Sequence, residues 1–344
     1  FDAVIVGSLG DAYLGGAGQA NQVTMIMWSG LYAASSAGAI YVAQFWGKSK
    51  DIHGIRKAFT VMVLSGCVIG TVFFIVSFFF RDNLMMILAR DAEVRQIGSD
   101  YLSVLSFAYL LWMFSAMLSS VLKAVSITRV PMIASALSII LNIILGIGLV
   151  HGIWIFPNMG IYGAALSTVI AAGVELVTLI LLARVIKAPI ALRMRDFLRP
   201  DKLFLGKFIK AGLPLLAKDQ LWAGGVAIYS ICFASLGVAA TAAYNVYGAM
   251  NGFMNIIFIS VGASGGIVIG QMLGAGRIEE AKNASWRLLR IIFFTGLLLA
   301  PFFILIRDIM LVPFPLLSDE TRLLSRQALL MISLVIWARG INFT

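Results

Sequence analysis

The sequence predicts an all-α, polytopic membrane protein, and three observations lead to this prediction. First, 60% of the 344 residues are hydrophobic and only 12% are charged, which is more apolar side chain than a soluble chain of this length can bury. Second, uncharged runs long enough to cross a bilayer recur along the whole chain. Third, residues 8–47 match residues 235–274 at nine of forty positions without a gap, which predicts two related halves.

The uncharged runs are each about as long as a membrane crossing. A helical crossing needs about 20 predominantly apolar residues, and the mean hydropathy of the chain is +0.96. We expect crossings at 22–46, 58–80, 101–122, 131–150, 161–183, 208–234, 241–269, 288–306 and 323–344.

The cationic residues are concentrated in alternate loops. Eighteen Lys and Arg residues lie in the segments 47–57, 123–130, 184–210 and 274–290, whereas six lie in the loops between them. Cationic loops stay on the cytoplasmic side of a membrane. We therefore expect a multi-pass protein of the plasma (cytoplasmic) membrane whose N-terminus, in the intact chain, is cytoplasmic.

The internal repeat predicts how the chain is organised. The match contains Ser-Leu-Gly at its beginning and Gln-x-x-Gly at its end, and a basic segment follows each copy. Because six crossings per copy is an even number, both copies enter the membrane from the same side, as in a parallel repeat. We expect an N-terminal lobe at 1–186 with about six helices and a truncated first helix, a cytoplasmic linker at 187–207, and an incomplete C-terminal lobe at 208–344 with about four of six helices.

Several stretches together resemble one known family. They read "DAVIVGSLGDAYLGGAGQANQV", "VAQFWGKSKDIHGIRKAF", "LNIILGIGLV", "FPNMGIYGAALSTVIAAGVE", "GLPLLAKDQLW" and "IGQMLGAGRIEEAK". They are similar to the first-helix motif, the end of the second helix with its following loop, the fifth and sixth helices, the opening of the seventh helix and the eighth-to-ninth connection of the multidrug and toxic compound extrusion (MATE) transporters. Together they cover essentially the whole chain. The resemblance implies a twelve-helix bundle of two six-helix lobes, clipped here at both ends. It also implies a secondary active antiporter that exports amphipathic, often cationic, organic compounds in exchange for H⁺ or Na⁺ by alternating access.

This chain departs from the family pattern at two positions. Gly146 stands where members of the family often carry an acidic or amide residue, and Asp219 stands where many carry Glu.

Asp2 is the first candidate for ion coupling. It lies in the truncated first helix, several residues before the expected end of that helix at Gly10. Burial among apolar side chains disfavours a charged carboxylate, which makes Asp2 a candidate proton acceptor. A Na⁺ ion held by the carboxylate and nearby carbonyl or amide oxygens is the alternative, and a helix-end residue without function is a third interpretation. The resemblance implies the ion-coupling role.

Asp219 is the second candidate. It follows Pro214 by five residues, and a proline frees a backbone carbonyl and permits a kink. An acid there is a candidate contact for a cation or a substrate. The adjacent Lys218 is not expected to pair with it, because neighbours in a helix do not face one another.

Other polar and aromatic residues in the crossings are candidates for a cavity lining. Aromatic rings such as Trp28 and Trp112 can stack on an organic cation. Interhelical hydrogen bonding and packing are the alternative roles for all of these side chains. The candidates are Glu175, Asn21, Gln22, Asn142, Trp222, Tyr229, Asn251 and Arg339.

The sequence also disfavours other classes of function. It contains no Walker motif, no Cys/His spacing typical of a metal site, and no paired acids or Ser/His pattern of an intramembrane enzyme. We expect no enzyme activity, no cofactor apart from the coupling ion, no nucleic-acid partner and a monomer in the lipid bilayer. The alternatives are a flippase for lipid-linked precursors, which would need more cations inside the crossings, and an inactive fragment of a transporter.

Overall fold

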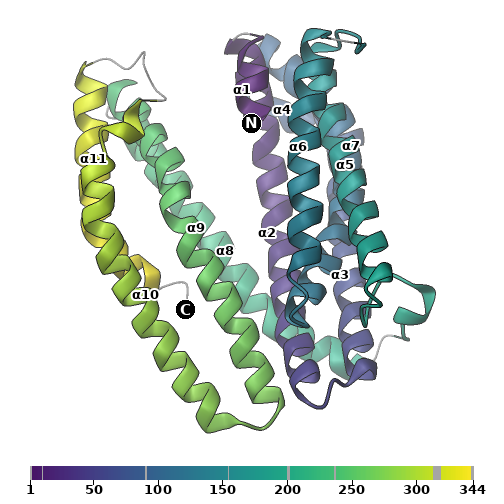
Figure 1. Cartoon of the computed structure of the whole chain (residues 1–344). Coiled ribbons are helices and arrows are strands. Elements are labelled where there is room, and N and C mark those ends of the chain that lie inside the picture. The colour runs from purple at the N-terminus through teal and green to yellow at the C-terminus, as the bar shows by residue number, and fades with distance from the viewer. Residues whose placement is uncertain are drawn as a thin grey trace. The chain divides into compact units, whose positions relative to one another are not determined.

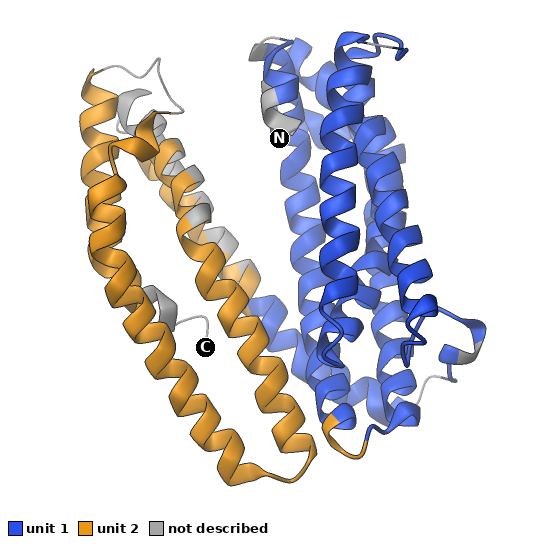
Figure 2. Ribbon diagram, in the orientation of Figure 1, with its two compact units in different colours: residues 1–46, 50–217 blue, residues 47–49, 218–344 orange. Residues whose placement is uncertain are grey.

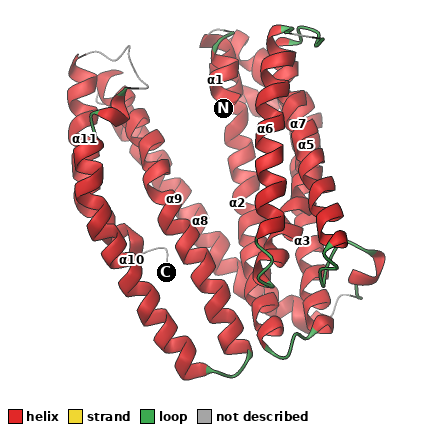
Figure 3. Ribbon diagram, viewed as in Figure 1, coloured by secondary structure: helices red, strands yellow, loops and turns green. Residues whose placement is uncertain are grey.

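The protein is an all-helical bundle in its computed structural model (Figures 1 and 3). The structure describes residues 2–9, 11–89, 91–153, 155–199, 202–235, 238–312 and 319–341, and these residues contain no strand. The chain divides into two compact units (Figure 2). Unit 1 comprises residues 1–46 and 50–217, and unit 2 comprises residues 47–49 and 218–344.

Unit 1 contains seven α-helices and the beginning of an eighth among the described residues. Asp51 and Asp91 begin two of them as N-caps: the Asp51 carboxylate accepts from the Gly54 amide at 3.0 Å, and that of Asp91 accepts from the Glu93 amide at 2.8 Å. The helices are α1 (Asp2–Gly7), α2 (Asp11–Gly47), α3 (Ile52–Phe79), α4 (Arg81–Leu88), α5 (Ala92–Ala124), α6 (Arg129–His151), α7 (Gly160–Val185), the short η1 (Met194–Asp196) and the first part of α8 (Lys202–Ser235).

Unit 2 contains the rest of α8 and the remaining helices. These are α9 (Val238–Gly274), α10 (Ile278–Ile306), the short η2 (Ile309–Leu311) and α11 (Asp319–Ile341). Its largest core cluster joins α9, α10 and α11 through buried side chains that include Phe258, Ile292 and Ile336. Pro214 lies inside α8, three residues before the boundary between the units.

The predicted crossings agree with the helices. Eight helices in the described part of the chain are long and apolar enough to cross a membrane, and they coincide with eight of the nine predicted runs. The ninth run, 208–234, lies within α8. The prediction of an all-α polytopic membrane protein is confirmed.

The repeat is visible in the positions of the helix ends. The sequence offset of 227 maps the bounds of α2, Asp11–Gly47, onto Val238–Gly274, which are the bounds of α9, and each helix has 37 residues. The same offset maps Ala92, the first residue of α5, onto Asp319, the first residue of α11. The two copies of the repeat therefore share helix bounds as well as a short sequence motif.

Glycines that recur in the repeat mark equivalent close contacts within each unit. Gly38 of α2 lies so close to Met62 of α3 that no Cβ fits between them, and Gly265 of α9 meets Leu288 of α10 in the same way. Small residues let two helices approach closely. The match of these glycines is explained by helix packing.

The linker after α7 is docked on α3 by a buried acid. The side chain of Asp196 is 1% exposed, and its Oδ2 accepts hydrogen bonds from the backbone amides of Ala191 at 3.0 Å and Arg193 at 2.9 Å. Its Oδ1 lies 3.6 Å from Nε of Arg56 in α3. A burial this complete is rare for a carboxylate without partners, and these three groups supply them.

Neighbouring contacts extend this docking. The backbone amide of Leu198 donates to Oγ1 of Thr60 at 2.9 Å, and the ring of Phe197 packs on that of Phe59 with centroids 5.6 Å apart. The ring of Phe204, at the start of α8, lies 5.1 Å from that of Tyr41 in α2. The segment predicted as a linker is thus part of the core of unit 1.

Candidate functional site

Helices α6 and α7 meet along a row of polar groups. Oγ of Ser135 donates to Oε1 of Glu175 at 2.7 Å, and Oγ of Ser138 donates to the carbonyl oxygen of Ala171 at 2.9 Å. The residue numbers rise on α6 as they fall on α7, so the two helices are antiparallel. Residues three and four apart lie on one face of a helix, and both contacts therefore lie on the same face of α6.

The row continues along both helices. Asn142 and Gly146 follow Ser138 at intervals of four residues, and a Cβ placed on Gly146 would lie 3.5 Å from Oγ of Ser167 on α7. We call this row the polar seam: Ser135, Ser138, Asn142 and Gly146 of α6, with Ser167, Thr168, Ala171 and Glu175 of α7. From Ser135 to Gly146 it spans about 16 Å along α6 at 1.5 Å per residue, roughly half of a hydrocarbon core.

Helix α1 packs at one end of the polar seam. A Cβ on Gly146 would lie 3.0 Å from Cδ1 of Ile5, so the side chain of Ile5 occupies the space that a larger residue at 146 would need. Oγ of Ser8 and Nε2 of His151, the last residue of α6, form a hydrogen bond of 3.1 Å. Asp2 precedes Ile5 by one turn of α1, and its side chain lies outside the described residues.

Substituting Gly163 tests how tightly the two helices meet. A Cβ on Gly163 of α7 would lie 2.6 Å from the carbonyl oxygen of Leu149 on α6, a backbone atom that cannot move independently. We expect Gly163→Ala to destabilise the protein by about 1–3 kcal/mol through overpacking. The measurement is the thermal unfolding midpoint of the purified protein in detergent.

Gly173→Ala on the same helix is the matched control. A Cβ there would lie 3.8 Å from Cδ1 of Leu111, an ordinary contact. Alanine favours a helix over glycine by up to about 1 kcal/mol, so this variant should unfold at the wild-type temperature or slightly above. Equal midpoints for the two variants would contradict the close approach at Gly163.

A second polar and aromatic cluster joins α2 and α5 within unit 1. Oγ1 of Thr24 and the hydroxyl of Tyr109 are 2.9 Å apart, and the ring of Trp112 lies 5.4 Å from that of Trp28. The two tryptophans were candidates from the sequence, whereas Thr24 and Tyr109 were not. Eighty-five residues separate these two positions, and no local pattern marks such a pair.

The candidates that precede Thr24 on α2 are less enclosed. The side chain of Asn21 is half-buried and that of Gln22 is exposed. Asn142 and Glu175 are both half-buried and both belong to the polar seam. The structure therefore brings Asn142 and Glu175 into one arrangement and leaves Gln22 on the surface of unit 1.

In unit 2, Asp219 pairs with its neighbour, contrary to expectation. Nζ of Lys218 lies 3.0 Å from Oδ1 of Asp219. The expectation was wrong because it considered only the directions in which adjacent side chains leave a helix. The four-carbon stem of lysine is long and flexible enough to bring the ammonium group back. The side chains of Trp222 and Tyr229, further along α8, are exposed within the described residues.

The repeat relates two amides of α9 to the aromatic cluster of unit 1. Asn251 and Asn255 correspond to Thr24 and Trp28 at the offset of 227, and Nδ2 of Asn255 donates to Oδ1 of Asn251 at 2.9 Å. Arg339 of α11 corresponds to Trp112, and its side chain lies outside the described residues. Equivalent positions of the two units thus carry different chemistry: a hydroxyl and two indole rings in unit 1, and two amides and a guanidinium in unit 2.

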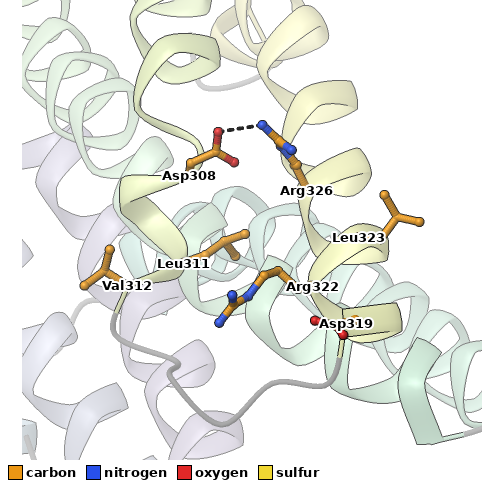
Figure 4. A pocket seen from close by; sticks show the side chains of 7 residues that line it. All are labelled: Asp308, Leu311, Val312, Asp319, Arg322, Leu323 and Arg326. Carbon is orange, nitrogen blue, oxygen red and sulfur yellow. Dashed lines mark hydrogen bonds and ion pairs between the residues drawn. The ribbon is translucent and has the colours of Figure 1, made fainter.

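A surface pocket of about 470 Å³ lies between the end of α10 and the start of α11 (Figure 4). Nη2 of Arg326 donates to Oδ2 of Asp308 at 2.8 Å, and both side chains are about half exposed. An exposed ion pair of this kind contributes about 0–1 kcal/mol. None of the predicted site residues lines this pocket. Among the described residues, no group of three His, Cys, Asp or Glu could hold a metal ion.

The fold and the site together define a class of protein. The helices are long enough to cross a membrane, form a parallel repeat and pack through small residues, and a polar seam with one acid joins two of them. These are features of polytopic membrane transporters with internal symmetry. A family model described as MatE matches residues 1–147.

Relatives with known names agree with this match. A probable multidrug resistance protein YoeA of Bacillus subtilis is 24% identical over 259 residues, which are 72% of this chain and 54% of that protein. A probable multidrug resistance protein NorM of Thermotoga maritima is 25% identical and matches 71% of this chain and 52% of its own length. The chain thus spans about half the length of these relatives.

Solved structures share the fold. An outward-facing conformation of a multidrug resistance MATE family transporter has a TM-score of 0.86 with 18% identity, and the match covers 99% of this chain and 78% of that one. A MATE protein in its straight conformation has the same TM-score and identity. The family model, the relatives and the shared fold support the resemblance to the MATE transporters that the motifs predicted.

Proposed function

We propose that the protein containing this chain is a secondary antiporter of the cytoplasmic membrane. It would export amphipathic, often cationic, organic compounds in exchange for an inward-moving ion, by alternating access. The supporting relatives are named as multidrug resistance proteins, and no nucleotide-binding motif occurs in the sequence. The basic segments would place the loop between α2 and α3 and the linker around Asp196 on the cytoplasmic side.

The observation that best supports this proposal is the packing of α1 on the polar seam. Helix α1 carries Asp2, and one turn later Ile5 meets Gly146 at the end of the seam. An ionisable residue within a crossing is costly and usually functional. An ion shifts a conformational equilibrium only by binding its two states with different affinity, and a carboxyl group at Asp2 would supply that difference.

We further propose that the coupling ion is a proton. A Na⁺ site needs several oxygen ligands, and Gly146 contributes no side-chain oxygen where the family pattern often has a carboxylate or an amide. The nearest described side chain on α1 at this position is the apolar Ile5. A lone carboxyl group can gain and lose a proton without further oxygen ligands. A Na⁺ ion would need another oxygen in place of the side-chain oxygen that Gly146 lacks.

Asp219 would contact the substrate in unit 2. Its ion pair with Lys218 is weak, because the side chain of Lys218 is 71% exposed. A cationic substrate could therefore replace the lysine ammonium at little cost. The exposed rings of Trp222 and Tyr229 on the same helix would add stacking on such a cation.

Transport by reconstituted vesicles tests the proposal. The full-length protein in liposomes is expected to export a fluorescent organic cation under an imposed proton gradient, with no ATP present. A sodium gradient of equal size, imposed without a proton gradient, is the matched condition and should give only the export of protein-free vesicles. Export under sodium alone would contradict proton coupling, and export under neither gradient would contradict secondary antiport.

A further inference from the structure

We propose that Glu175 is a proton-binding site of unit 1, distinct from Asp2, and that Ser135 holds its carboxyl group in place. Ser135 contacts Oε1, which leaves Oε2 to bind the proton. The role of this site in transport rests on the proposed antiport, but proton binding at Glu175 can be measured without any transport.

Glu175 is the one acid in the long apolar stretches of unit 1 that follow α1. The segments 12–47, 58–80, 101–122, 130–150 and 161–183 contain no other Asp, Glu, Lys, Arg or His. Glu175 lies ten residues, or about 15 Å, before the end of α7 at Val185. A charged side chain at such a depth is expensive and is typical of ion pathways.

The helices that pack against α7 carry their charged groups at their ends. Helix α7 packs against α5, α6 and α1. On α5, Leu111 lies level with Glu175, because its Cδ1 is 3.8 Å from the Cβ position of Gly173. On α6, Ser135 lies level with Glu175. The titratable and charged groups of these helices are Asp2 on α1, Glu93, Arg95, Asp100, Tyr101, Tyr109 and Lys123 on α5, Arg129 and His151 on α6, and Tyr162 and Arg184 on α7 itself.

Among these groups, each cation lies six or more residues along its helix from the position that is level with Glu175. Arg129 is six residues from Ser135 along α6, about 9 Å of helix rise, and Lys123 is twelve residues beyond Leu111 on α5. Tyr109 is hydrogen-bonded to Thr24 on the other side of α5. An ionised Glu175 would therefore keep an unbalanced charge, which a bound proton removes.

The hydrogen bond with Ser135 suits both forms of the carboxyl group. A carboxylate has about four acceptor positions, and the Ser135 hydroxyl fills one of them. The protonated acid gives up part of this capacity and needs fewer donors, so it suits a half-buried position between α6 and α7. The ionised form would need water on its remaining positions, and we expect more water to reach the seam when that part of the bundle opens. Proton affinity at Glu175 would thus differ between an open and a closed state.

Infrared spectroscopy of the reconstituted full-length protein tests this inference. The carbonyl stretch of a protonated carboxyl group is separate from the amide bands, and its intensity follows protonation as pH is changed. We expect one titrating band to disappear in Glu175→Gln, which keeps the size of the side chain and an oxygen that accepts from Ser135. In Ser135→Ala, the same band should remain but move to higher frequency, because its carbonyl loses a hydrogen bond.

Glu93→Gln is the matched control, since Glu93 is an exposed acid in the first turn of α5. It should remove intensity only where water-exposed carboxyl groups absorb. A Glu175→Gln spectrum identical to wild type, or identical to that of Glu93→Gln, would overturn the inference, as would a Ser135→Ala band at the wild-type frequency. Failure of gradient-driven export in wild-type vesicles would contradict the antiport proposal and leave these spectra unaffected.

Discussion

Asp2→Asn in the full-length protein is expected to reduce proton-driven export of an organic cation by about tenfold or more. The amide has nearly the same shape as the acid but cannot exchange a proton at any accessible pH. The two states of the bundle would then bind protons equally at this position, and the gradient could no longer favour one of them through Asp2. If the pKa of the carboxyl group differs by one unit between the two states, losing that difference removes about 1.4 kcal/mol of coupling free energy. This corresponds to about a tenfold loss of coupling. Dye efflux from vesicles under an imposed proton gradient measures the effect.

Glu279→Gln is the control for this variant. Glu279 is an exposed acid in the first turn of α10, and its neutralisation should leave export at the wild-type rate. Both variants should show wild-type helix content by circular dichroism and a wild-type unfolding midpoint. Unchanged proton-driven export in Asp2→Asn would remove Asp2 from the coupling mechanism.

Asp196→Ala is expected to destabilise unit 1 by about 3 kcal/mol or more. The substitution removes a carboxylate that is 1% exposed, leaves the amides of Ala191 and Arg193 without their acceptor, and takes away the ion-pair partner of Arg56. The linker should then separate from α3, and the contact between Leu198 and Thr60 should be lost with it. Thermal unfolding in detergent measures the destabilisation, and limited proteolysis between α7 and α8 measures the exposure of the linker.

Met194→Ala is the matched control in the same short helix. The side chain of Met194 is 90% exposed, so its truncation should change the unfolding free energy by less than about 0.5 kcal/mol. A linker that is cleaved no faster in Asp196→Ala than in Met194→Ala would contradict the docking role of Asp196.

The sequence predicted the number and order of the crossings well but set most helix starts too late. The run predicted from 22 belongs to a helix that begins at Asp11, and the run predicted from 101 belongs to α5, which begins at Ala92. Hydropathy detects the part of a helix in hydrocarbon. The helices extend beyond it through polar turns, and α5 starts where the carboxylate of Asp91 accepts from the amides of Glu93 and Val94.

The candidate site was only partly predictable, because its contacts depend on the register between helices. Glu175 and Asn142 were recognised as polar residues in apolar runs, but the partner of Glu175 is forty residues away at Ser135, and periodicity does not specify how two helices slide against each other. The segment around Asp196 was expected to be a cytoplasmic linker, and its cationic composition does not indicate that it packs on unit 1. A single well-placed acid, with backbone amides and Arg56 as partners, brings it into the core instead.

The docked linker has a consequence for how the chain is made. Every contact that completes unit 1, including those of Asp196 and Phe204, lies before residue 218. Domains tend to fold in the order of synthesis, with the N-terminal one first. The first half can therefore reach its final packing in the membrane while the ribosome is still translating the second. A premature stop after α8 begins would leave an inserted, folded half, whereas a stop before Asp196 would leave the base of α3 uncovered.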